Sequence, residues 1–195
     1  GYGYRAAVEE SEFEEVRKMF ETNFYAPAKL INKVLPQMRV RKSGAIINVT
    51  SIGAIRAAVG NAYYSASKSA LELISDGLHK EASHLGIKVM MVEPGAFRTN
   101  FYNANSSLKG SSIKIDDYNE TVGKMRIENV IDNHNQLGDP MKAGEVRVET
   151  IEKEDYPEHL LLGSDAVNMS ITEFENRIEE AKKWKSISIK TDFKD

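Results

Sequence analysis

The stretch AIINVTSIGAIRAAVGNAYYSASK, residues 45–68, decides the fold of this chain. Its first six residues, 45–50, are mostly apolar and rich in β-branched side chains, which is typical of a buried strand. Residues 61–85 have the pattern of one long helix, and Gly86 is suited to the left-handed conformation that often ends a helix. The stretch therefore predicts a buried strand followed by a long helix.

A second apolar run follows this helix and completes the unit. Residues 87–92 read IKVMMV, and the dipeptide Pro94-Gly95 stops the run. A strand, a helix and a strand with connections of this length form a βαβ unit, whose strands are parallel and whose crossover is right-handed. We therefore expect a parallel α/β sheet.

The segment before this unit has a helical pattern with two interruptions. Apolar residues recur at helical spacing between charged positions over residues 10–42. Pro27 and Pro36 lie inside that range, and a proline inside a helix removes a backbone donor and clashes with the preceding turn. We expect a kinked or broken helix here.

The segment after the unit, residues 96–136, is polar and rich in Asn and Ser, with a helix predicted near 117–130. A long segment that leaves the carboxyl end of a strand in a parallel α/β protein usually covers the ligand crevice. We expect 96–136 to cover the substrate, and a flexible surface insertion is the alternative. Three further elements are predicted: a helix at 140–153, a strand at 159–163 and an amphipathic closing helix at 170–184. Without a linker or an internal repeat, residues 1–195 are expected to form a single domain.

Composition and charge exclude several classes of partner. The chain has 195 residues, and 26 Lys and Arg against 29 Asp and Glu give a net charge of -3, without a basic stripe for nucleic acid or anionic lipid. The lack of cysteine excludes disulfides and thiol chemistry and fits a reducing compartment. No apolar run reaches the roughly 20 residues of a membrane span, and the start lacks the layout of a signal peptide. We expect a cytoplasmic protein that binds neither nucleic acid nor membranes.

The four histidines show no pattern of metal ligands. His79 and His84 are five positions apart and lie on different faces of the predicted helix, and His134 and His159 are far away in the sequence. We expect solvated histidines and no metal site.

Tyr64 and Lys68 are four positions apart on the predicted helix, so their side chains share one face. A phenol with a pKa of about 10 is a poor acid or base at neutral pH, and a nearby ammonium lowers that pKa. Tyr64 would then exchange a proton with a substrate oxygen. Ser51 ends the preceding strand, at the edge where parallel sheets bind ligands, and its hydroxyl is placed to hold that oxygen. Taken alone, the spacing of Tyr64 and Lys68 is a weak signal, because on an arbitrary helix such a pair usually lies on the surface.

Three motifs at these positions resemble the short-chain dehydrogenase/reductase family. The sequence YSASK at 64–68 is similar to the active-site motif of that family, and Ser51, thirteen positions before Tyr64, matches its catalytic serine. The sequence PGAFRT at 94–99 is similar to its segment beside the nicotinamide. The resemblance implies a Rossmann-like, doubly wound parallel sheet with helices on both faces, here only its C-terminal part. It also implies hydride transfer between NAD or NADP and a small carbonyl or alcohol substrate.

The resemblance extends upstream to TNFY at 22–25, where the fourth catalytic residue of the family maps onto Asn23. Pro27 has no N–H, so the carbonyl of Asn23 lacks its helical partner. In the family, a water held there relays protons through the lysine to the tyrosine. Ala26 departs from the family, which often has glycine at this position, and a kinked core helix with an incidental asparagine is the alternative.

By the same resemblance, Lys68 holds the ribose hydroxyls of the nicotinamide nucleotide, while Thr99 and the backbone of Phe97 face the carboxamide. Thr99 is also suited to cap the segment that follows it. The predicted catalytic residues are Asn23, Ser51, Tyr64 and Lys68, and the predicted cofactor-binding residues are Tyr64, Lys68, Pro94, Gly95, Phe97 and Thr99.

The glycine-rich turn that binds the pyrophosphate in this family does not occur in the sequence. Gly1 is similar to the last residue of the family's Asn-Asn-Ala-Gly segment, so we expect that the parent protein has at least two further βα units before it, and NAD cannot be told from NADP. Strand 45–50 would then lack a neighbour. We expect either another segment paired along it or a bare edge, with Ile46, Ile47 and Val49 uncovered.

Two classes of function remain open. The leading hypothesis is the hydride-transfer enzyme, and the alternative is a non-catalytic binding or structural protein that keeps the fold, or an inactive fragment without the phosphate loop. The helices at 10–42 and 61–85 resemble the paired interface helices of the family, so we expect a homodimer or homotetramer. Ala66, Ala70 and Ala82 would permit close approach there, or would simply pack on the sheet.

Overall fold

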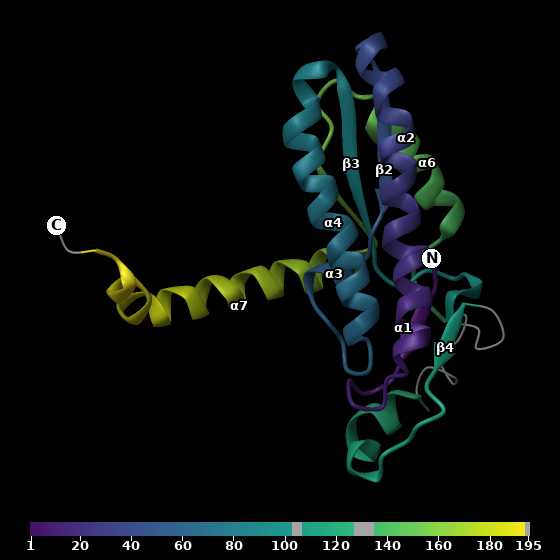
Figure 1. The fold of residues 1–195 in the computed structure, drawn as a ribbon, viewed down its shortest axis with the longest axis vertical. Helices are drawn as coiled ribbons and strands as arrows, with labels where there is room; N and C mark the ends of the chain where they lie inside the picture. The colour runs from purple at the N-terminus through teal and green to yellow at the C-terminus, as the bar shows by residue number, and fades with distance from the viewer. Residues whose placement is uncertain (103–106, 127–134, 194–195) are drawn as a thin grey trace.

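The fold is given by a computed structural model, which describes residues 1–102, 107–126 and 135–193 (Figure 1). Its centre is a parallel sheet of three strands in the order β2-β3-β5: β2 (Gly44–Val49), β3 (Ile87–Pro94) and β5 (His159–Leu162). The helix between the first two strands is α4 (Ala62–Ala82), followed by a short 3-10 turn, η2 (Ser83–Leu85). Gly86 then takes a φ of 75°. The predicted βαβ unit and third strand are confirmed.

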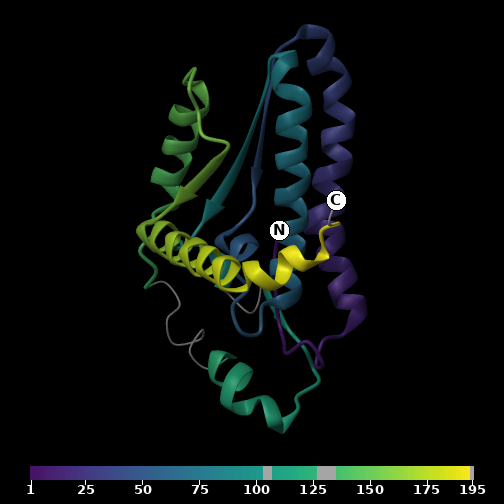
Figure 2. The same ribbon diagram turned by 90° about the vertical axis from the view of Figure 1, so that its left-hand side faces the viewer.

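Helices cover both faces of this sheet, as Figure 2 shows. Because side chains alternate along a strand, Ile87, Val89 and Met91 of β3 pack on one face with α2 (Ala26–Arg41) and α4. Met90 and Val92 pack on the other face, toward α6 (Pro140–Glu152). The Rossmann-like α/β class is thus confirmed.

The predicted break in the helix at 10–42 lies just before Pro27. Helix α1 (Phe13–Phe20) passes into a π-helical turn, η1 (Glu21–Tyr25), before α2 begins. Pro27 occupies the first turn of α2, where its missing N–H costs nothing within that helix. Pro36 lies inside α2, which continues to Arg41, so only the first proline coincides with an interruption.

A second, two-stranded parallel sheet was not predicted. It pairs β1 (Gly3–Arg5) with β4 (Leu108–Gly110) and thereby ties the segment after β3 to the start of the chain. Instead of one regular helix near 117–130, this segment has the 3-10 turns η3 (Asn100–Tyr102) and η4 (Asp116–Tyr118) and the π-helical turn η5 (Asn119–Gly123). Residues 124–126 continue as helix, and 127–130 lie outside the described residues.

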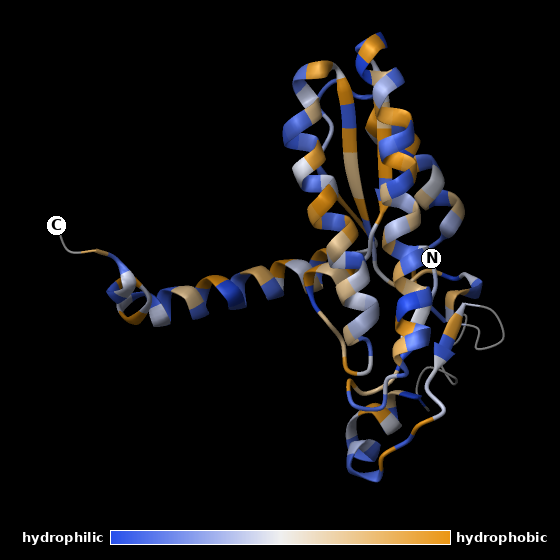
Figure 3. Cartoon of the chain, in the orientation of Figure 1, coloured by the Kyte–Doolittle hydropathy of each residue, from blue (hydrophilic) through white to orange (hydrophobic). Residues whose placement is uncertain are grey.

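The last helix differs most from its prediction. Helix α7 (Ser164–Ser188), followed by η6 (Ile189–Thr191), is longer than 170–184 and projects away from the sheet rather than closing it (Figure 1). Figure 3 shows apolar and polar residues interspersed along it. Phe174, Ile178 and Trp184 are about half exposed, at 47%, 52% and 49%. Among the described helices, none combines the length and apolar character that crossing a membrane requires.

Strand β2 has a bare edge among the described residues, because its only strand neighbour there is β3. Val49 is 42% exposed, as expected, but Ile46 is only 8% exposed. The expectation that Ile46 would be uncovered is wrong, because α2 and α4 still cover its face of the sheet.

Candidate active site

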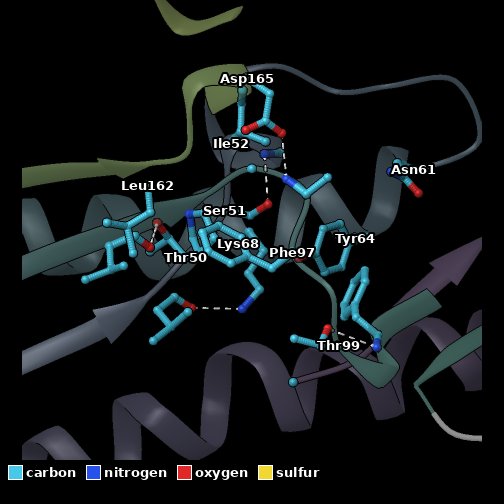
Figure 4. Close-up of a pocket in the computed structure, with 18 of the residues that line it drawn as sticks. Thr50, Ser51, Ile52, Asn61, Tyr64, Lys68, Phe97, Thr99, Leu162 and Asp165 are labelled. Atoms are coloured by element: carbon cyan, nitrogen blue, oxygen red, sulfur yellow. Dashed lines mark hydrogen bonds between the residues drawn. The ribbon is translucent and has the colours of Figure 1, made fainter. Parts of the chain in front are cut away.

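A cavity of about 660 Å³ lies at the carboxyl ends of β2 and β3, where a parallel sheet places its ligands. Figure 4 shows Ser51, Tyr64 and Lys68 around this space. Ser51 lies two residues after the end of β2 and caps the short helix α3 (Ile52–Ile55), while Tyr64 and Lys68 come from the first turns of α4. The cavity lining also includes four other predicted residues: Pro94, Gly95, Phe97 and Thr99.

The Ser51 hydroxyl is held from two sides. Its Oγ accepts a hydrogen bond of 3.0 Å from the backbone N–H of Gly53, which caps α3. The same hydroxyl lies close enough to the phenol of Tyr64 to act on its pKa. The two oxygens therefore meet at one point of the cavity.

Burial has the largest effect on the pKa of Tyr64. It raises that pKa above its ordinary value, whereas the nearby Ser51 hydroxyl and the positive charge of Arg5 act to lower it. The ammonium of Lys68 donates to the carbonyl of Val49 at 2.9 Å. Arg5, which the sequence did not single out, is a cation whose charge acts on Tyr64.

Lys68 is a buried cation at the cavity wall. Only 8% of the residue is exposed, and burial lowers the pKa of Lys68 to about 8. Its ammonium has three protons, and the carbonyl of Val49 accepts one of them. The remaining donors are available to a ligand in the cavity.

Asn23 lies in the π-helical turn η1, buried at 2% exposure, and does not line the cavity. Its amide clamps the backbone of Tyr2: Oδ1 accepts from the N–H at 3.0 Å and Nδ2 donates to the carbonyl at 2.9 Å. Nδ2 also donates to Ser67 Oγ at 3.1 Å, and that hydroxyl donates to the carbonyl of Tyr64. The side chain of Asn23 therefore joins the first residues of the chain to the turn of α4 that carries Tyr64.

The turn after β3 is braced by a residue that sequence reasoning missed. Asp165, in the first turn of α7, accepts a 2.7 Å hydrogen bond from the N–H of Ala96. A Cβ on Gly95 would meet the Asp165 carboxylate at 2.3 Å, so only glycine fits there. Thr99 accepts from the N–H of Phe101 at 3.2 Å, and the capping role considered for it is confirmed.

The opposite wall of the cavity comes from β1 and η3. The ring of Phe101 lies 5.5 Å from the ring of Tyr64, and the guanidinium of Arg5 lies 5.9 Å from the ring of Tyr102. The sequence offered little signal for these residues, because the pairing of β1 with β4 joins positions about a hundred residues apart.

The expectation of four solvated histidines needs correction. His84 is exposed, and His134 lies outside the described residues. His79 is paired with Glu158 at 2.9 Å, and His159 contacts the buried Glu93 at 2.5 Å. Glu72, Glu93 and His159 place their ligand-type atoms within 4.8 Å of one another, a cluster that arises because β5 pairs with β3.

The fold and this cavity define an α/β protein of the Rossmann-like class with a serine, a tyrosine and a lysine at the carboxyl ends of its strands. The family model for short chain dehydrogenase matches residues 1–109, more than half of the chain. The chain belongs to this family, which confirms the resemblance found in the sequence.

Individual relatives agree with this assignment. Oxidoreductase claN of Passalora fulva is 40% identical over 104 residues, which are 53% of this chain and 48% of claN. A short-chain dehydrogenase from Streptomyces avermitilis has a TM-score of 0.90 at 38% identity, covering 99% of this chain and 69% of that one. A gluconate 5-dehydrogenase from Burkholderia cenocepacia J2315, in complex with NADP and tartrate, has a TM-score of 0.52 at 26% identity, over 53% of this chain and 41% of its own. The chain thus spans about half the length of claN.

Proposed function

We propose that the protein transfers a hydride between NAD or NADP and a carbonyl or alcohol substrate. The observation that carries this proposal is the meeting of the Tyr64 phenol, the Ser51 hydroxyl and the Lys68 ammonium at one cavity. In the reducing direction, Tyr64 would donate a proton to the substrate oxygen, and Ser51 would hold that oxygen by a hydrogen bond. In the oxidising direction, Tyr64 would take the proton back.

The residues present fit a nicotinamide nucleotide, which supplies or accepts the hydride when bound. Lys68 lines the cavity and has donors beyond the one used by Val49, which suits two ribose hydroxyls. The backbone of Pro94, Gly95 and Phe97, with Thr99, forms the adjoining wall where the carboxamide would lie. The relative solved with NADP supports this assignment, and the choice between NAD and NADP stays open.

Asn23 is proposed as the fourth member of the site, acting through its backbone carbonyl and a water. The π-helical turn at 21–25 supports this role, because it interrupts the regular helical bonding just before Pro27. Because the Asn23 side chain holds Tyr2 and Ser67, its substitution would also loosen the turn that carries Tyr64.

Residues 96–136 are proposed to cover the substrate, and the placement of Phe101, Tyr102 and Met125 in the cavity lining supports this. A homodimer or homotetramer through α1, α2 and α4 is also proposed. Leu30 on α2 and Leu73 on α4 are 66% and 70% exposed, and Ala66 is exposed, whereas Ala82 is part of the core. A cytoplasmic location and a single domain over 1–195 remain predictions.

The test compares Tyr64→Phe with Tyr63→Phe in an assay that follows nicotinamide absorbance over a panel of aldehydes, ketones and alcohols. Removing the Tyr64 hydroxyl should lower turnover by about a thousandfold or more, while dinucleotide binding measured by fluorescence stays within a few-fold. Tyr63 packs in the same apolar cluster without reaching the cavity, so its variant should stay active. Retained turnover in Tyr64→Phe would remove Tyr64 from its role, and binding without any wild-type turnover would favour the non-catalytic alternative.

A further inference from the structure

Arg5 is a buried cation that the proposed mechanism does not use. It ends β1, where pairing with Gly110 of β4 fixes its backbone, and only 8% of the residue is exposed. Its side chain lines the same cavity as Ser51 and Tyr64. Because the backbone of Arg5 is paired and its side chain is buried, its guanidinium is held at the cavity instead of extending into water.

Two of the three guanidinium nitrogens of Arg5 have no hydrogen-bond partner among the described residues. Its Nε and Nη1 are buried without a hydrogen bond, and no ion pair to it is found within residues 1–102, 107–126 and 135–193. Its contact with the ring of Tyr102, at 5.9 Å, is a cation–π contact that satisfies no N–H. Burying a charge without a counter-ion is costly, and arginines in protein interiors are normally paired with carboxylates. A structural role in packing does not account for this arrangement.

The surrounding charges point to an anion as the missing partner. The described lining of the cavity contains the cations Arg5, Arg56, Lys68 and Arg147. Its one carboxylate there is Asp165, which accepts from the N–H of Ala96 on the side of the cavity formed by the turn after β3. An anionic ligand would therefore meet an excess of positive charge, and a carboxylate matches the planar fork of a guanidinium with two parallel hydrogen bonds.

We propose that Arg5 binds a carboxylate of the substrate, so that the substrates are oxo acids and the corresponding hydroxy acids. This inference rests on the proposed function, because it places the reacting carbonyl of the same molecule at Tyr64 and Ser51. No covalent step involves Arg5, which positions the substrate by an ion pair.

The two anchoring points lie on rigid elements, which adds a second expectation. Arg5 is on a paired strand and Tyr64 is on the first turn of α4, and both side chains line the same cavity. Because both anchors are fixed, a substrate held at both must have its carbonyl at a fixed distance from its carboxylate. Activity should therefore peak at one position of the oxo group along a straight chain.

The test uses 2-, 4- and 5-oxohexanoate and their methyl esters as substrates of the wild-type protein, Arg5→Gln, Arg5→Lys and the control Arg17→Gln, an exposed arginine of α1. We expect the wild type to prefer one oxo acid over its ester by about a hundredfold in kcat/KM. Arg5→Gln should lose that preference by slowing the acid far more than the ester, Arg5→Lys should keep part of it, and Arg17→Gln should match the wild type.

Other outcomes separate this inference from the proposed function. Equal turnover of acids and esters by the wild type, or an equal loss of both in Arg5→Gln, would overturn the carboxylate site while leaving the enzyme intact. If the wild type turns over neither acids nor esters, calorimetry with the oxo acids still decides: saturable binding that Arg5→Gln abolishes supports the site, and no binding overturns it. If Arg5→Gln fails to fold, the test uses the ratio of kcat/KM for the acid to kcat/KM for its ester. An acid preference in the wild type that falls in Arg5→Lys supports the site, and a ratio near one in the wild type overturns it.

Discussion

The two walls of the cavity are built in opposite ways. The sheet wall, with Ser51, Tyr64 and Lys68, stands on the six-residue strand β2 and a 21-residue helix. The covering wall, with Arg5 and Phe101, stands on three-residue strands and a 3-10 turn. Under the proposed function, the regular wall would carry the chemistry and the irregular wall the selectivity, a division that is expected when a rigid scaffold presents variable segments.

The walls also differ in what holds them. The sheet wall is held by apolar clusters on both faces of the sheet, in which Val89, Met90 and Met91 have no exposed surface. The covering wall depends on a few polar contacts over long sequence separations, above all those of Glu10. Its buried carboxylate accepts from the N–H groups of Ala7 and Ile115, both within 3.0 Å, and pairs with Arg126.

Substitution of Glu10 by Gln should loosen the covering wall and leave the sheet wall intact. The buried carboxylate loses its ion pair and weakens two hydrogen bonds, so the segment at 111–126 should come loose at a cost of roughly 2–4 kcal/mol. Hydrogen exchange should then rise throughout 111–126, while β3 keeps its protection. The control is Glu9→Gln, because Glu9 is exposed and binds Tyr118 of the same segment. Unchanged exchange at 111–126 in Glu10→Gln would show that β1–β4 pairing alone holds the covering wall.

The two walls also differ in how much of their structure can be predicted from the sequence. The strands, α4 and the positions of Ser51, Tyr64 and Lys68 follow from short-range patterns, because apolar runs and the spacing along one helix suffice to place them. The β1–β4 pair, Arg5 and Asp165 do not, because their contacts depend on which distant segments meet. Helix α7 was predicted with the right type but the wrong role, since an amphipathic pattern states which face is apolar and not what covers it.

Replacing Gly95 by Ala tests the sheet wall, and we expect a smaller loss of stability than for Glu10→Gln. The new Cβ would meet the carboxylate of Asp165 at 2.3 Å, so the turn after β3 must shift. We expect a loss of about 1–3 kcal/mol in stability and a fall in nicotinamide affinity. Gly77 on α4 has nothing within 4 Å of an added Cβ, so Gly77→Ala should instead gain about 0.5–1 kcal/mol. Urea unfolding of both variants checks the pair, and equal effects would contradict the close approach at Gly95.

A smaller effect than that of Gly95→Ala is expected at the polar cluster of Glu72, Glu93 and His159, which lies on the sheet side, away from the covering wall. Burial, and then the negative charge of Glu93, raise the pKa of Glu72 to about 7. One oxygen of Glu72 is buried without a hydrogen-bond partner, and Glu93 is already engaged with His159. In the unfolded chain a glutamate ionises near pH 4.3. The folded state therefore holds the proton of Glu72 more tightly than the unfolded state.

The sign of the pH dependence follows from that difference. As pH rises from about 4.3 to about 7, the unfolded chain releases the Glu72 proton before the folded protein does, so Glu72 destabilises the fold increasingly over this window and fully above it. Glu72→Gln removes the charge, and it should be more stable than the wild type at pH 8 by roughly 1–2 kcal/mol, a value reduced for the partial exposure of the side chain. At pH 5 about a third of this difference should remain. Thermal unfolding at both pH values, with the exposed Glu81→Gln of the same helix as control, decides the matter, since a gain of equal size at pH 5 and pH 8 would show that packing and not ionisation sets the effect.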